Sequence, residues 1–238
     1  MKKYILLVLI TTLFISCEKE LSSSQLLENT IAYHDPNNMW NSFNASFHVT
    51  METPDAPNRE SDITINNPAS SFYLKAVRDS TMIEYKVSGD NCNIALNRST
   101  EFTEEEAKAN NLNCDRAHMY KNYYSYLYGL PMKLKDPGTN ISEVVERKTF
   151  KGKAYIVLKA TYDEEVGTDI WYFYFDPETY AMEIYQFFKI DENGNQNDES
   201  GEYILLTEEM VVNDIKMPKA RAWYYNKDDK YLGTDILK

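Results

Sequence analysis

Cys114 and His118 are the two residues whose types and spacing come closest to a catalytic pair. Residues four positions apart share one face of a helix, so the thiol and the imidazole would lie together there, next to Asp115. A thiolate near a helix N-terminus and beside a histidine can act as a nucleophile. The competing interpretation is a disulfide between Cys114 and Cys92, which would leave no nucleophile. We expect the disulfide, and therefore no catalytic residue.

The choice between thiolate and disulfide depends on the compartment, which the start of the chain indicates. Residues 1–16 have a basic beginning and an apolar run over 4–15, shorter than the roughly 20 residues of a membrane-spanning helix. This pattern predicts a secretory signal peptide. The residues up to Cys17, FISC, resemble a bacterial lipobox, although leucine is usual where Phe14 stands. We expect a lipid anchor on Cys17 and a polar tether over 17–24; an ordinary secretory signal is the alternative.

Export leaves two cysteines in the folded part of the chain, Cys92 and Cys114. An even number of cysteines in an exported protein favours a disulfide. The bond would close a loop of about 22 residues and contribute roughly 3 kcal/mol on the chain-entropy model. Two buried free thiols are the alternative.

A run of oxygen-bearing side chains has the spacing of a calcium loop, with Gln196 at the sixth position where a glycine is required. The run consists of Asp191, Asn193, Asn195, Asn197, Glu199 and Glu202. A polar hairpin loop is the alternative, and we expect no metal. The three histidines stand in no metal-ligand spacing, and the chain contains no GxSxG, HExxH, P-loop or GxGxxG motif. We therefore expect no cofactor.

The composition suits one large domain of 238 residues, with 43% apolar residues and nineteen tyrosines. This abundance of aromatic residues favours a β-rich fold. The formal charge of −12, which becomes more negative once Lys2 and Lys3 are removed, argues against nucleic acid and against docking on anionic headgroups.

Residues 114–130 predict a helix with one aromatic face. Gly129 is expected to close this helix in a left-handed conformation, and Pro131 cannot continue it. Capping boxes predict short helices over 22–33 and 103–109. The stripe of the long helix consists of Tyr120, Tyr123, Tyr124 and Leu127.

The remaining chain predicts strands. Residues 43–51 alternate between apolar and polar side chains, as in a strand buried on one face, whereas 170–175 is apolar on both faces, so both should be covered. Residues 53–58, with two prolines, predict a loop. Further strands are expected at 62–66, 72–78, 82–87, 93–97, 144–150, 154–162, 169–175, 180–190, 202–212, 221–226 and 231–237.

Short connections imply that strands adjacent in the sequence pair antiparallel. We expect a mainly β (α+β) domain over 25–238, built on a strongly curved antiparallel sheet or half-barrel of about ten strands, with an inserted helical segment covering the concave face. The aromatic residues of this hollow would line a cavity or fill a core. The candidates are Trp40, Phe43, Phe47, Tyr120, Tyr123, Tyr124, Leu127, Trp171, Phe173 and Phe175.

Several segments resemble the motifs of a family of uncharacterised bacterial envelope lipoproteins, which is a domain of unknown function. They are YYSYLYGLPMKLKDPGT (123–139), DIWYFYFDPETY (169–180), GEYILL (201–206), MPKARAWYYN (217–226) and LGTDIL (232–237). The family assigns no catalytic residues, so the resemblance implies none here.

The order of strands, inserted helix and further strands is also distantly similar to the lipoprotein localisation factors. That resemblance implies a half-barrel of antiparallel strands closed by helices over an apolar cavity that holds acyl chains. The expectation is a monomeric lipoprotein of the cell envelope, anchored in the outer membrane on its periplasmic or surface face, that binds a lipid or another apolar ligand without catalysis. The alternatives are an interaction or scaffold lipoprotein with a filled core and, third, an enzyme using Cys114 and His118.

Overall fold

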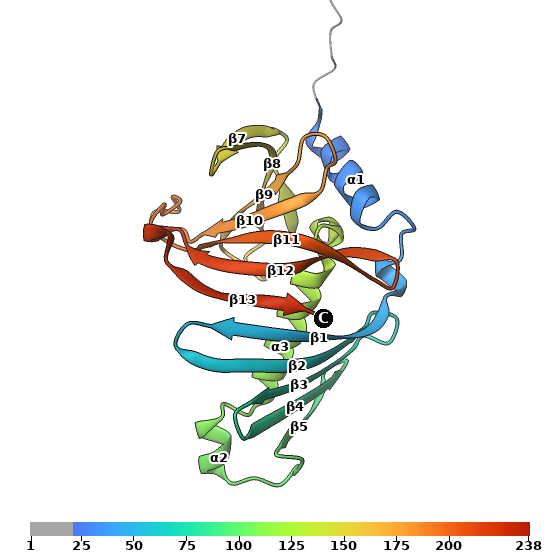
Figure 1. Ribbon diagram of the computed structural model, residues 1–238, viewed down its shortest axis with the longest axis vertical. Coiled ribbons are helices and arrows are strands. Elements are labelled where there is room, and N and C mark those ends of the chain that lie inside the picture. The colour runs from blue at the N-terminus through green and yellow to red at the C-terminus, as the bar shows by residue number, and fades with distance from the viewer. Residues whose placement is uncertain (1–20) are drawn as a thin grey trace, which may run out of the picture.

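One antiparallel sheet of thirteen strands, curled into a half-barrel, forms the frame of the molecule in a computed structural model that describes residues 21–238 (Figure 1). The expected signal peptide and Cys17 lie outside the described residues. The first five strands are β1 (Asn44–Thr53), β2 (Ala56–Asn66), β3 (Ser71–Arg78), β4 (Thr81–Ser88) and β5 (Asn91–Leu96). The other strands are β6 (Thr139–Ile141), β7 (Glu146–Phe150), β8 (Lys153–Tyr162), β9 (Ile170–Phe175), β10 (Met182–Phe188), β11 (Glu202–Val212), β12 (Ile215–Tyr225) and β13 (Tyr231–Leu237).

The sheet consists of two meanders joined at one place. The strands β1 to β5 pair in chain order, and so do β8 to β13. The last strand then pairs with the first, with Val49 opposite Leu237 and Met51 opposite Asp235. The short strands β6 and β7 both pair with β8 at the far edge. The curved antiparallel sheet with an inserted helical segment is thus confirmed, with thirteen strands where about ten were expected.

Several details of the sheet differ from the sequence prediction; β12, for example, begins at Ile215, six residues before the strand expected over 221–226. The segment predicted as a loop over 53–58 is mostly strand, because β2 begins at Ala56 and the hairpin turn is short. The strand β6 occupies part of a segment whose Pro137 and Gly138 indicated only a turn. In both segments the pairing that a neighbouring strand offers outweighs local residue preferences, which are weak in strands.

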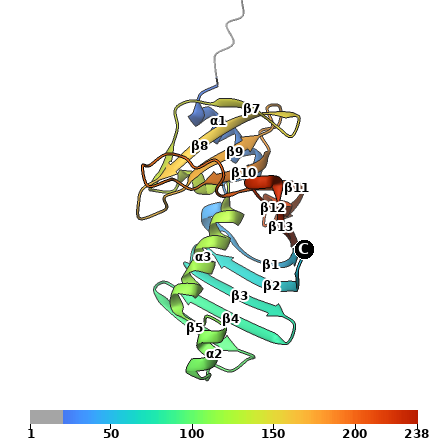
Figure 2. The same cartoon turned by 90° about the vertical axis from the view of Figure 1, so that its left-hand side faces the viewer.

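The helical segment that lies between the two meanders in sequence covers the concave face of the sheet. The long helix α3 (Cys114–Gly129) crosses the strands of the first meander, and Figure 2 shows it in front of β3 and β4. The remaining helical segments are α1 (Ser23–His34), α2 (Glu104–Ala109) and the 3-10 turns η1 (Trp40–Ser42), η2 (Met132–Lys135) and η3 (Lys227–Asp229). The helix α1 begins at Ser23, inside the range 17–24 that was predicted to be a polar tether.

The end of α3 differs from the prediction in the conformation of Gly129. Gly129 is the last helical residue and does not take the left-handed conformation; Leu130 follows in an extended conformation. A side chain at Gly129 would instead overlap the ring of Trp40. Glycine is therefore required here for close approach between helix and indole, and Pro131 ends the helix as predicted.

Side chains of both sheet faces are buried where the sequence is apolar on both faces. In β9, Phe173 and Phe175 point into the main core with α3, whereas Tyr172 and Tyr174 belong to a second cluster on the outer face. That second cluster is covered by β7 and the 191–200 loop: the Lys148 ammonium lies 3.7 Å from the centre of the Tyr172 ring, and the Tyr172 hydroxyl donates to Gln196 Oε1 at 2.9 Å.

Candidate functional site

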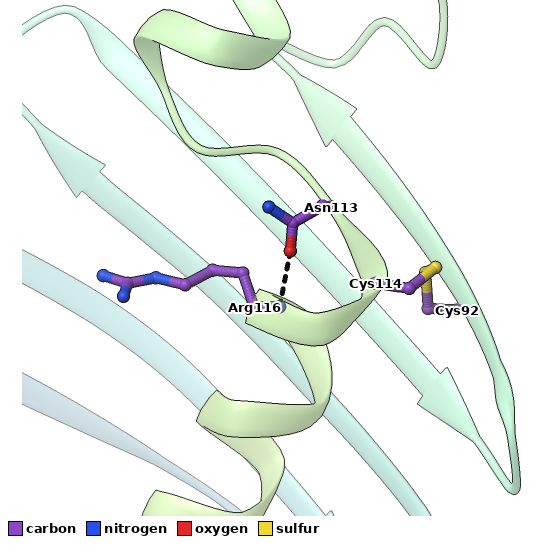
Figure 3. Close-up of a disulfide and its surroundings, with 4 residues drawn as sticks. All are labelled: Cys92, Asn113, Cys114 and Arg116. Atoms are coloured by element: carbon purple, nitrogen blue, oxygen red, sulfur yellow. Dashed lines mark hydrogen bonds between the residues drawn. A yellow bond between two sulfur atoms is a disulfide. The ribbon is translucent and has the colours of Figure 1, made fainter.

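The helix α3 is fixed at both ends and so sets the shape of the hollow. At its start, Asn113 Oδ1 accepts a hydrogen bond of 2.7 Å from the Arg116 amide, and a disulfide joins Cys114 to Cys92 of β5, with Cα atoms 5.7 Å apart (Figure 3). At its end, Gly129 lies against Trp40. A helix held in this way keeps its aromatic stripe at a fixed distance from the sheet.

The ten residues predicted to line a cavity do come together on the concave side of the sheet. All of them belong to or pack against one hydrophobic cluster. Seven are buried in it, with Phe43, Phe173 and Phe175 at 0% exposure. The three partly exposed ones are Tyr120, Tyr123 and Trp171, and each of these lines a pocket.

A pocket of about 700 Å³ lies between α3 and the loop that joins β8 to β9. Its aromatic wall contains Tyr123, Tyr126, Tyr162 and Trp171. The hydroxyls of Tyr126 and Tyr162 are hydrogen-bonded to each other, and the Tyr126 ring meets Trp171 edge to face at 5.8 Å. Burial raises the pKa of Tyr162 to about 12, so this wall stays uncharged at neutral pH. Polar side chains, including Lys121, also line the pocket and make it amphipathic.

Beneath α3 the core contains charged groups that sequence analysis missed. Arg221 of β12 is 1% exposed; its guanidinium lies 4.0 Å from the centre of the Tyr128 ring and donates to the Pro218 carbonyl at 3.1 Å. Asp235 of β13 stands opposite Arg221 in the sheet, and burial raises the pKa of its carboxyl group. Arg59 of β2 donates to the Tyr124 hydroxyl at 2.9 Å.

No signal in the sequence distinguishes these three charged residues from the charged residues that strands expose to solvent. Tyr126, by contrast, lies beside the predicted helical stripe and was missed as a cavity residue only because it is one position off its centre. Tyr162 could be found only through its contact with Tyr126.

The alternative of an enzyme that uses Cys114 and His118 requires a free thiol at Cys114, and the structure contradicts that requirement. The sulfur of Cys114 is bonded to Cys92, so no thiolate is available beside the histidine. The disulfide is the pairing expected from the sequence.

The segment with calcium-loop spacing forms a hairpin loop that satisfies its own backbone. The Asp191 carboxylate accepts hydrogen bonds from the amides of Asn193 at 2.9 Å and Asn195 at 2.8 Å, and the bond from Asn195 contributes most to lowering its pKa. Across residues 21–238, no three His, Cys, Asp or Glu side chains gather as metal ligands would.

The buried histidine His34 is structural. Its Nδ1 donates to the Lys216 carbonyl at 2.9 Å, and its Nε2 accepts from the Met182 amide at 3.0 Å. Burial lowers the pKa of this imidazole, so the neutral ring that both hydrogen bonds require is the favoured form. Through this ring, α1 is joined to β10 and β12.

The half-barrel and its covering helix define a class of fold that other solved structures share. A LolA superfamily protein from Nitrosomonas europaea superposes with a TM-score of 0.53 at 8% identity, over 91% of each chain. A DUF1329 family protein from Desulfovibrio piger superposes with a TM-score of 0.50 at 7% identity, over 90% of each chain. The distant resemblance to the LolA-like half-barrel is thereby confirmed at the level of fold.

The chain itself belongs to a family of unknown function, DUF6503, whose model matches residues 2–237. No curated protein sequence matches the chain. Within residues 21–238, no helix combines the length and the apolar character that a membrane crossing requires.

Proposed function

We propose that this protein is a lipoprotein of the cell envelope, anchored through Cys17, whose half-barrel binds a lipid or another apolar ligand without catalysis. The observation that carries the proposal is the pocket of about 700 Å³ beside α3, with its wall of Tyr123, Tyr126, Tyr162 and Trp171. This volume lies within the range of small-molecule sites, roughly 300–1,000 Å³. The similarity in fold to a LolA superfamily protein is consistent with the proposal.

Binding would be driven by removal of acyl methylene groups from water, at about 0.8 kcal/mol for each methylene buried. The pocket suits an amphiphile better than a pure hydrocarbon, because polar side chains line its rim. Lys121 and Lys133 are among these, on α3 and η2. A chain would lie along the aromatic wall with its polar end toward the rim.

Uptake of a fluorescent fatty acid by the detergent-solubilised full chain tests the pocket. Ser125 lines it, so Ser125→Trp should fill part of the volume and weaken binding about tenfold, the loss of roughly two buried methylenes. Ser24→Trp, on the exposed surface of α1, is the matched control and should bind as the wild type does. Equal uptake by both variants would place the ligand elsewhere or show adsorption to the surface alone.

A scaffold lipoprotein with a filled core is the second candidate, and one observation favours it. Seven of the ten predicted lining residues are packed in the core, with Phe43, Phe173 and Phe175 fully buried. Under that alternative, the protein would take up no fatty acid, and its outer face would be functional. A chain that neither binds the probe nor carries lipid when isolated would decide for the scaffold.

A further inference from the structure

A second hollow, of about 410 Å³, lies at the other end of α3, between the start of that helix, α2 and the strands β2 to β4. Three of the six arginines in the chain line it: Arg59, Arg78 and Arg116. The remaining wall includes the rings of Tyr85 and Tyr120, whose centres are 5.5 Å apart. This arginine pocket shares no lining residue with the pocket beside Tyr126.

The fold directs all three arginines to this place. Arg59 lies on the same concave face of β2 as Ile63 and Ile65, and Arg78 lies on the same face of β3 as Leu74. Both side chains therefore start from the inner surface of the sheet. Arg116 lies in the first turn of α3. Its side chain extends away from the disulfide and over the strands (Figure 3).

These three arginines are half-buried, and their guanidinium groups lack carboxylate partners in the part of the chain that the structure describes. Among residues 21–238, none of the three forms an ion pair with a carboxylate. Arg59 and Arg116 donate only to tyrosine hydroxyls, those of Tyr124 and Tyr120. The Nε atoms of Arg59 and Arg78 are buried and have no hydrogen-bond acceptor in this part of the chain.

Leaving such donors unpaired is costly, since a buried N–H without an acceptor costs about 1–3 kcal/mol and more when it is charged. Like charges brought into one hollow repel each other as well. The chain has a formal charge of −12, so carboxylates to pair with these arginines are plentiful. Asp79 alone among the acidic residues lines the pocket, and it forms no ion pair there.

We propose that this arginine pocket binds an oxyanion: the carboxylate or phosphate group of a small ligand or of a lipid headgroup. Guanidinium groups present paired N–H donors that match two oxygens of a carboxylate or phosphate. The Tyr120 ring, on which the Arg116 guanidinium lies at 4.8 Å, holds one donor group in position. Ala76 and Ile83 supply an apolar floor for the part of the ligand that carries no charge.

The test uses the full chain in a nonionic detergent, titrated by isothermal calorimetry in buffer of low ionic strength. Inorganic phosphate is the first probe, and dihexanoyl phosphatidate and dihexanoyl phosphatidylcholine are the second and third. The variants are Arg78→Gln, which breaks no side-chain hydrogen bond among residues 21–238, and Arg116→Gln. Arg147→Gln, an exposed arginine on β7, is the matched control. Thermal melting of each variant verifies that it is folded.

The proposal predicts that phosphate binds, that Arg78→Gln and Arg116→Gln each weaken the affinity about tenfold, and that Arg147→Gln leaves it unchanged. If phosphatidate binds at least about tenfold tighter than phosphate and phosphatidylcholine binds weakly, the natural ligand is a lipid headgroup. If phosphate and phosphatidate bind with equal affinity, the natural ligand is a free anion. The proposal is overturned if neither phosphate nor phosphatidate binds, or if both pocket variants bind as tightly as the control.

The result is distinguishable from a failure of the proposed function. Fatty-acid uptake beside Ser125 and phosphate binding beside Arg78 are measured with different probes and different variants, in pockets that share no residue. Either site can be lost while the other remains.

Discussion

At the scale of single residues, the least expected feature is Arg221, a fully buried arginine in the middle of the sheet. It connects layers that no apolar side chain could connect, because it donates to the Pro218 carbonyl in its own strand and, at 3.5 Å, to the Leu127 carbonyl of α3. It also lies near Asp235, whose carboxyl pKa is raised by burial and lowered in part by Arg59 and Arg221. Arg221 therefore stabilises both the helix position and a buried acid.

Replacing Arg221 with methionine should lower the free energy of unfolding by about 3 kcal/mol, because the two carbonyls lose a donor and Asp235 loses a positive neighbour. In an Asp235→Asn background the same replacement should cost about 1 kcal/mol less. Urea denaturation of the four proteins measures this coupling. Costs that simply add would show that Arg221 and Asp235 act independently.

His48 gives the outer face a pH dependence with a definite sign. Its Nδ1 is 2.8 Å from Asp62 and its Nε2 is 2.6 Å from Glu60, and the bond to Asp62 contributes most to raising its pKa. A raised pKa in the folded state means that this stabilisation is complete below the unfolded value of about 6.5 and is lost as the pH rises through the folded value. The difference in unfolding free energy between wild type and His48→Gln should therefore shrink as the pH rises above about 6.5.

A difference that grows with pH would contradict the doubly protonated His48 in this network. His34 is the internal comparison, because its pKa is lowered by burial and its sign is opposite. Its contribution is present above pH 6.5 or so and is lost as the pH falls through the folded value. Wild type and His48→Gln both retain His34, so the contribution of His34 is the same in both and drops out of the measured difference in unfolding free energy.

At the scale of elements, α3 decides the shape of both pockets, and its two ends are held by different means. The Gly129 end depends on close contact with Trp40. Gly129→Ala should lower the free energy of unfolding by about 2 kcal/mol, because overpacking outweighs the better helix propensity of alanine. Gly167→Ala is the matched control, since nothing lies within 4 Å of its added methyl, and it should be neutral. Equal stability of both variants, measured by thermal melting, would contradict the close approach at Trp40.

The other end of α3 depends on the bond between Cys92 and Cys114. Replacing both with serine should lower the free energy of unfolding by about 3 kcal/mol, for a loop closed across a separation of 22 residues. Hydrogen exchange should speed up in the first turn of α3 more than at Gly129, because only the first end is released. Free thiols detected in the untreated oxidised protein would contradict the bond itself.

The elements were largely predictable because each leaves a local signal. The capping box at Ser22 and the aromatic stripe with Tyr124 marked helices, and alternation marked strands such as that around Phe47. Gly129 was misjudged because a glycine before Pro131 suggests a left-handed cap, whereas its role depends on Trp40, almost ninety residues earlier. Contacts between distant segments leave no local pattern.

At the scale of the whole molecule, one strand pairing joins the two meanders. The strands β1 and β13 pair without a connecting hairpin. Because no turn residues indicate this pairing, the sequence could not predict it. The same limit applies to the site: alternation predicted that aromatic residues would gather inside, but which of them would line a pocket depends on how the curled sheet meets α3. Arg59, Arg78 and Arg116 converge only once β2, β3 and α3 are assembled.

Native mass spectrometry of the full chain extracted from its own membranes tests the central claim most directly. If the half-barrel binds a lipid, the wild-type protein should carry the mass of a lipid beyond any anchor at Cys17, and Ser125→Trp, which fills the pocket beside α3, should carry much less. Protein that shows only the mass of the chain and its anchor, in wild type and variant alike, would contradict the claim.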